Sequence, residues 1–123
     1  QTLLRRQPVV LLSARADAPR LGFSWEGFAV EETLRLLEPG TEAFFYRTHA
    51  GAELDLLAVR GRTRFGFEMK YEDAPRLTRS MHVALQDLGL DHLWVICPDG
   101  QPHPLADRVT VVPLSLLGGA LRG

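Results

Sequence analysis

The stretch Thr63-Arg64-Phe65-Gly66-Phe67-Glu68-Met69-Lys70-Tyr71 decides the fold of this chain. Successive side chains of a strand point to opposite faces, so it predicts a strand whose core face carries Phe65, Phe67 and Met69. The same alternation places Gly66, Glu68 and Lys70 together on the other face. The predicted strand therefore carries one acidic and one basic side chain on the face away from its core.

Two segments before this strand complete a predicted antiparallel meander. Residues 43–48 and 53–59 are rich in aromatic and β-branched side chains, and breaks of hairpin length, His49-Ala50-Gly51 and Arg60-Gly61-Arg62, separate the three segments. In residues 53–59, alternation puts Leu54, Leu56 and Ala58 on one face. Asp55 falls on the other face, and we expect it to lie on the same side as Glu68 and Lys70.

Helices are predicted on both sides of the meander. The first spans residues 24–38, with Ser24 as its N-cap and Pro39-Gly40 as its end; the second runs from Pro75 to about Leu88 and ends at Gly89. Residues 91–97 then predict a buried strand parallel to a neighbour, and residues 108–112 a last short strand, before residues 114–121 close the chain. The predicted class is α/β, a mixed central sheet flanked by helices in the order α-β-β-β-α-β-β.

Length and composition indicate one soluble domain. The 123 residues suit a single core, and we assign residues 1–21 to a lead-in segment and residues 22–123 to the domain. A net charge of -1 argues against a strongly basic surface that grips phosphate backbones unaided. The single cysteine, Cys97, excludes an internal disulfide and suits a reducing cytoplasm. No apolar run of about 18 residues and no secretory signal occurs, so we expect a cytoplasmic protein without a membrane partner.

Asp55, Glu68 and Lys70 form a candidate metal site on the predicted sheet. Two carboxylates at neighbouring strand positions repel each other unless a cation lies between them. Carboxylate oxygens, with waters completing the shell, are the ligands that Mg²⁺ or Mn²⁺ prefers. The alternative is a solvated sheet face that carries an ordinary Glu-Lys pair.

The first helix adds a third acid. At 100° per residue, Glu26 lies in one stripe with Val30, Thr33 and Leu37, so it falls on the apolar face, where a carboxylate needs a partner. That partner is either the candidate metal or an arginine such as Arg47, since buried carboxylates are usually paired.

The pattern of Glu26, Asp55 and Glu68-x-Lys70 resembles the PD-(D/E)XK nuclease superfamily, whose restriction-endonuclease-like core has the same order of elements. Further stretches are similar to one group, the uncharacterised domain at the C-terminal end of prokaryotic AAA-type ATPases: Trp25-Glu26-Gly27-Phe28, Tyr46-Arg47-Thr48, Gly51-Ala52-Glu53-Leu54-Asp55, Phe67-Glu68-Met69-Lys70-Tyr71 and residues 75–90. Leu54 stands where the superfamily pattern has proline.

The resemblance implies a Mg²⁺- or Mn²⁺-dependent nuclease domain that hydrolyses phosphodiester bonds in DNA. Asp55, Glu68, the Met69 carbonyl and Glu26 would be metal ligands, and Lys70 would orient the attacking water or stabilise the developing charge. Such relatives carry an N-terminal ATPase module. No P-loop motif occurs here and the sequence begins with Gln1, so we expect a C-terminal fragment of a longer protein. The alternative is a catalytically silent nuclease-fold module that regulates the ATPase or binds another protein.

The second helix supplies candidate substrate contacts. Arg79, His82 and Gln86 are spaced by three and four residues and share one face, from which Arg79 and Gln86 could hold DNA. A solvated helix face explains the same spacing. The aromatic residues are interpreted as core rather than as base-stacking platforms: Trp25, Phe28, Phe44, Phe65, Phe67 and Trp94.

Overall fold

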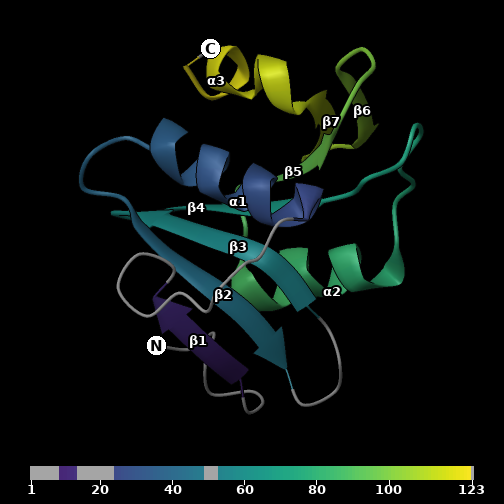
Figure 1. Cartoon of the computed structure of the whole chain (residues 1–123). Coiled ribbons are helices and arrows are strands. Elements are labelled where there is room, and N and C mark those ends of the chain that lie inside the picture. The colour runs from purple at the N-terminus through teal and green to yellow at the C-terminus, as the bar shows by residue number, and fades with distance from the viewer. Residues whose placement is uncertain (1–8, 14–23, 49–52, 123) are drawn as a thin grey trace.

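The computed structural model describes residues 9–13, 24–48 and 53–122, and its described strands form one seven-stranded mixed sheet (Figure 1). The strands are β1 (Val9–Ser13), β2 (Glu42–Thr48), β3 (Glu53–Arg60), β4 (Thr63–Met69), β5 (His92–Cys97), β6 (His103–Ala106) and β7 (Val109–Pro113). Their spatial order is β1-β2-β3-β4-β5-β7-β6. β4, β5 and β7 are parallel, and the other neighbours are antiparallel. The predicted α/β class, a mixed sheet with helices, is therefore confirmed.

Three helices cover the two faces of this sheet (Figure 1): α1 (Trp25–Leu36), α2 (Arg79–Leu88) and α3 (Leu114–Arg122). α1 and α3 lie on one face, where Val30 and Leu117 pack against Phe67. α2 lies on the other face, where Met81 and Leu85 pack in a separate cluster. Each face of the central strands is consequently buried.

Local capping fixes where the helices begin. The Ser24 hydroxyl accepts a 3.1 Å hydrogen bond from the Gly27 backbone N–H, which confirms Ser24 as the N-cap of α1. α2 begins at Arg79 and not at Pro75, so the predicted start is wrong. The Thr78 side chain accepts from the Met81 N–H at 3.2 Å and sets the first turn there. Gly89 ends α2 in the left-handed conformation, at φ 58°.

The sheet also contains strands that the sequence did not predict. β1 comes from the segment treated as a lead-in, and it pairs with β2 from Val9↔Thr48 to Ser13↔Phe44. β6 adds a short antiparallel edge beside β7. The predicted break at His49-Ala50-Gly51 lies outside the described residues. In the part of the chain that is described, no helix is both long and apolar enough to cross a membrane.

Gly66 shows how tightly the second face is packed. A Cβ atom at this position would lie 2.7 Å from Leu90 Cδ1, and 3.0 Å from both Leu54 Cδ2 and Leu93 Cδ1. Glycine therefore avoids close contacts with these leucine side chains beneath α2. The expectation that only the Phe67 face of β4 is core is wrong, because the Gly66 face is buried as well.

Candidate functional site

A bulge in β3 positions Asp55. Phe44 pairs with Leu57 and Tyr46 pairs with Leu54, so Phe45 alone opposes Asp55 and Leu56. Leu54 then packs with Leu57 beneath α2, whereas Leu56 packs beneath α1. The strict alternation predicted for this strand is wrong, since Leu54 and Leu56 do not share a face. Bulges of this kind re-aim side chains, and they recur beside active sites.

The Asp55 carboxylate is held against β4. Its Oδ2 accepts a 2.7 Å hydrogen bond from the Met69 backbone N–H. That nitrogen is bonded to the carbonyl carbon of Glu68, so the carboxylate lies against the Glu68–Met69 peptide unit. Asp55 and Glu68 are thus brought together at the end of β4. There, the bond from the Met69 N–H to the Asp55 side chain takes the place of a regular backbone hydrogen bond between β3 and β4.

The Met69 carbonyl points to the β3 side of β4. The Lys70 N–H donates to the Ile96 carbonyl at 2.7 Å, on the β5 side of β4. No peptide bond in the described residues is cis, and in a trans peptide the carbonyl points away from the N–H of the next residue. The Met69 carbonyl therefore points toward β3, the side on which Asp55 lies.

Glu68 is buried, at 8% exposure, and Lys70 contacts it. Lys70 Nζ lies 3.8 Å from Glu68 Oε2, and about a third of the lysine side chain is exposed. The two side chains share one face, as predicted. The alternative, a solvated sheet face with an ordinary Glu-Lys pair, is wrong about the solvation of Glu68, but the Glu-Lys pair itself is present. Burying a carboxylate is costly unless it is paired or binds a cation.

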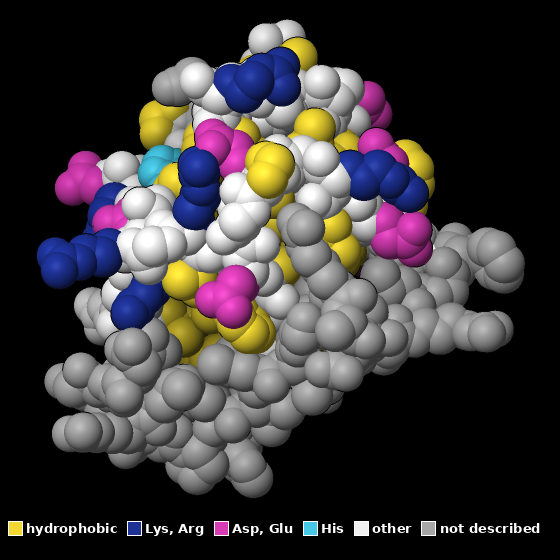
Figure 2. Space-filling model, turned by 90° about the vertical axis from the view of Figure 1, so that its left-hand side faces the viewer, with side chains coloured by type: hydrophobic (Ala, Val, Ile, Leu, Met, Phe, Trp, Pro, Cys, Tyr) yellow, Lys and Arg dark blue, Asp and Glu magenta, His cyan; other side chains and the backbone are white. Residues whose placement is uncertain are grey.

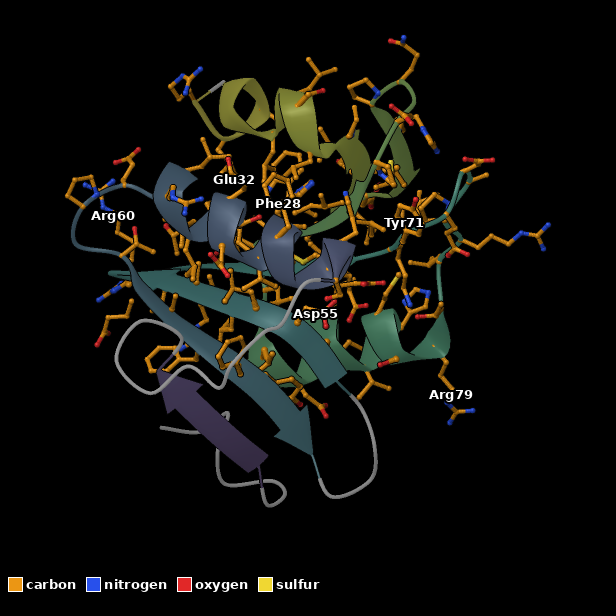
Figure 3. The ribbon with its side chains drawn as sticks, in the orientation of Figure 1. Phe28, Glu32, Asp55, Arg60, Tyr71 and Arg79 are labelled. Atoms are coloured by element: carbon orange, nitrogen blue, oxygen red, sulfur yellow. The ribbon has the colours of Figure 1, made fainter. Side chains whose placement is uncertain are left out.

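Glu26 lies in the first turn of α1. Figure 3 shows Asp55 beneath this N-terminal end of the helix. The interpretation of Glu26 as a buried acid is wrong, because its side chain is exposed. Val30 and Thr33 of the same stripe are buried, but the stripe reaches solvent at the helix N-terminus. The side chain of Arg47, the suggested partner, lies outside the described part of the chain. A role for Glu26 at the metal stays a prediction.

The two candidate substrate contacts lie on the exposed surface of α2. Figure 3 shows Arg79 extending away from the body of the molecule and from Asp55. Gln86 occupies the last turn of the same helix. Arg79 is therefore not brought to Asp55, and the contact of either residue with DNA stays a prediction.

The sequence did not predict that two aromatic side chains, Phe28 and Tyr71, are exposed. Phe28 is 54% exposed and Tyr71 is 67% exposed, so the interpretation of Phe28 as core is wrong. The ring of Tyr71 lies 5.6 Å from that of Trp25, centroid to centroid. The helical period could have identified Phe28, since it lies about 160° from the buried Val30.

Two cavities in the described residues lie elsewhere. One, of about 420 Å³, lies at the end of the β3–β4 hairpin among Leu37, Thr41 and Phe65. The other, of about 580 Å³, lies between α1 and α3. Neither of these two cavities is lined by Asp55 or Glu68.

The donor atoms suit a hard divalent cation. Two carboxylates and one carbonyl are oxygen ligands of the kind that Mg²⁺ and Mn²⁺ bind. Among the described side chains, no group of three or more His, Cys, Asp or Glu residues could hold a metal ion. A cation at Asp55 and Glu68 would accordingly need the Met69 carbonyl and waters to complete its shell.

The comparisons with known proteins agree with one another. Residues 21–117 match the family described as "Domain of unknown function (DUF4143)". An uncharacterised protein of Mycobacterium tuberculosis, Rv2008c, and one of Mycobacterium bovis, Mb2031c, are each 42% identical over 95 residues, which is 77% of this chain. The chain spans only 21% of the length of either relative. No solved structure matches. The chain therefore belongs to the DUF4143 family.

Proposed function

We propose that this domain is a metal-dependent phosphodiesterase that acts on DNA and is attached to an AAA-type ATPase. The observation that carries the proposal is the gathering of Asp55, Glu68 and Lys70 at the end of β4, through the Asp55–Met69 bond and the Glu68–Lys70 contact. The chain order from α1 to β5 supports a restriction-endonuclease-like core. It consists of a helix, three antiparallel strands, a helix and a parallel strand.

Each residue would have a distinct role. Asp55, Glu68 and the Met69 carbonyl would hold the cation, and Glu26, in the first turn of α1, would act through a water bound to it. A bound Mg²⁺ or Mn²⁺ would polarise the phosphodiester and lower the pKa of a bound water. Lys70, already beside Glu68, would orient the nucleophile and stabilise negative charge that develops on the phosphate.

A second function, a catalytically silent module that regulates the ATPase or binds protein, is favoured by the surface charges. Figure 2 shows basic and acidic side chains interspersed on one face of the molecule. Arg60 pairs with Glu38, and Arg35 pairs with both Glu31 and Glu32. Ion pairs of this kind leave little net positive charge to attract a phosphate backbone.

Cleavage of labelled DNA oligonucleotides, single- and double-stranded, tests the proposal. With Mn²⁺ present, we expect the wild-type chain to release fragments, and Lys70→Met to lose at least about a hundredfold in rate while it still binds Mn²⁺. Arg35→Met, which removes an exposed cation of α1, serves as the control and should cleave like the wild type. Mn²⁺ binding without cleavage by the wild type would instead support the silent module.

A further inference from the structure

A groove between α1 and α3 leaves a hydrophobic helix face uncovered. Its wall on α1 is formed by Trp25, Phe28, Glu32 and Leu36, which recur every three or four residues along one side of the helix. The wall on α3 is formed by Leu114, Ser115, Gly118, Gly119 and Arg122. Figure 3 shows Phe28 and Glu32 on the side of α1 toward α3. The groove therefore runs along both helices.

The two glycines of α3 shape this groove differently. A Cβ at Gly118 would lie 3.2 Å from Leu36 Cδ2, so this glycine allows α1 and α3 to approach. A Cβ at Gly119 would meet nothing within 4 Å. Space is thus left open at Gly119, in the same groove as the exposed ring of Phe28, for side chains from outside these two helices.

We propose that this groove receives an amphipathic α-helix supplied by the additional polypeptide of full-length family members. The two mycobacterial relatives extend well beyond this domain, since the chain spans 21% of their length. Trp25, Phe28 and Leu36 give the α1 wall apolar positions on one side of the helix, the kind of surface against which a partner helix packs its own apolar face. Arg122, on the α3 wall, would accept an acidic residue of that helix. The inference does not depend on the metal site.

The shape and charge of the groove favour a helix over other ligands. From Trp25 to Leu36 the wall extends about 16 Å along the helix axis, which is long for one small molecule but suits about three turns of a partner helix. An acidic wall residue, Glu32, and the net charge of -1 are unfavourable for nucleic acid.

The rate at which a maleimide labels an introduced cysteine tests the proposal. The cysteine is placed either in the groove or at an equally exposed position of α1 outside it. Phe28 is 54% exposed as a residue, and the Glu31 side chain, on α1 but not in the groove, is 52% exposed. In the isolated chain, Phe28→Cys and Glu31→Cys should react with a maleimide at similar rates. Buried Cys97, whose thiol pKa is raised by burial, should contribute little background.

The decisive comparison uses the intact M. tuberculosis relative with cysteine at the two aligned positions. We expect the position aligned with Phe28 to be labelled at least about tenfold more slowly than the position aligned with Glu31, because the docked helix must open first. Equal rates would overturn the proposal. Protection that disappears when the relative is diluted to a monomer would also overturn it, and would assign the groove to a second copy.

Discussion

The Met69 backbone N–H donates a 2.7 Å hydrogen bond to Oδ2 of Asp55, and this bond ties the bulge of β3 to the last residue of β4. It positions a carboxylate at the end of β4, in the interior of the sheet. Asp55 consequently has two roles, a structural one as acceptor for the backbone and a proposed one as ligand for a cation. Substitutions can separate the two.

Asp55→Asn should preserve the fold, because an amide oxygen can still accept from the Met69 N–H. Asp55→Ala should lower the free energy of unfolding by about 1.5–3 kcal/mol, the contribution of a hydrogen bond to a charged group. Urea denaturation of the two variants measures the difference. Equal stability of Asp55→Ala and wild type would show that the bond contributes nothing.

Gly66→Ala should destabilise the protein by about 1–3 kcal/mol, since the added methyl group would overlap Leu90 and press on Leu54 and Leu93 in a close-packed core. Gly119→Ala is the matched control. It adds a methyl group to an open position of α3 and should stabilise by up to about 1 kcal/mol through helix propensity. Thermal unfolding of both variants checks the signs, and a Gly66→Ala protein as stable as wild type would refute the packing argument.

Stability should fall in mildly acidic solution because of His92. Burial lowers the pKa of His92 below 6.5, and its Nε2 lies 2.8 Å from the Thr110 hydroxyl. The unfolded chain therefore binds a proton that the folded chain does not, and stability is lost as the pH falls from about 6.5 through the lowered pKa. His92→Gln should reduce this slope of Tm against pH, whereas His82→Gln, on the exposed surface of α2, should leave it unchanged. Identical slopes for all three proteins would contradict this account.

Much of the fold followed from local signals. Ser24, the Gly61-Arg62 turn and Gly89 marked the ends of elements, and apolar alternation identified β4 with Glu68 and Lys70 on one face. These features depend on residues close in sequence. β6 was missed because Pro104 and its neighbours show no apolar alternation, and the strand exists only as an edge beside β7.

Alternation predicted that Asp55 lies beside Glu68, but not how it is held there, because that depends on a bulge. Alternation assumes a regular strand, and neither Asp55 nor Leu56 is a residue type that indicates a bulge with an extra residue in β3. The bulge is stabilised by the bond to Met69, which is fourteen positions away in sequence. The burial of Glu68 was missed for a similar reason, since α2 covers that face only after the chain has crossed over the sheet.

Calorimetric titration with Mn²⁺ tests the proposed metal site most directly. We expect the wild-type chain to bind one Mn²⁺, and Asp55→Asn and Glu68→Gln each to weaken that binding at least about tenfold, because each removes a charged oxygen ligand. Glu31→Gln, an exposed acid on α1, should bind Mn²⁺ as the wild type does. A wild-type chain that binds no Mn²⁺, or an affinity unchanged by Asp55→Asn and Glu68→Gln, would contradict a metal site at the end of β4.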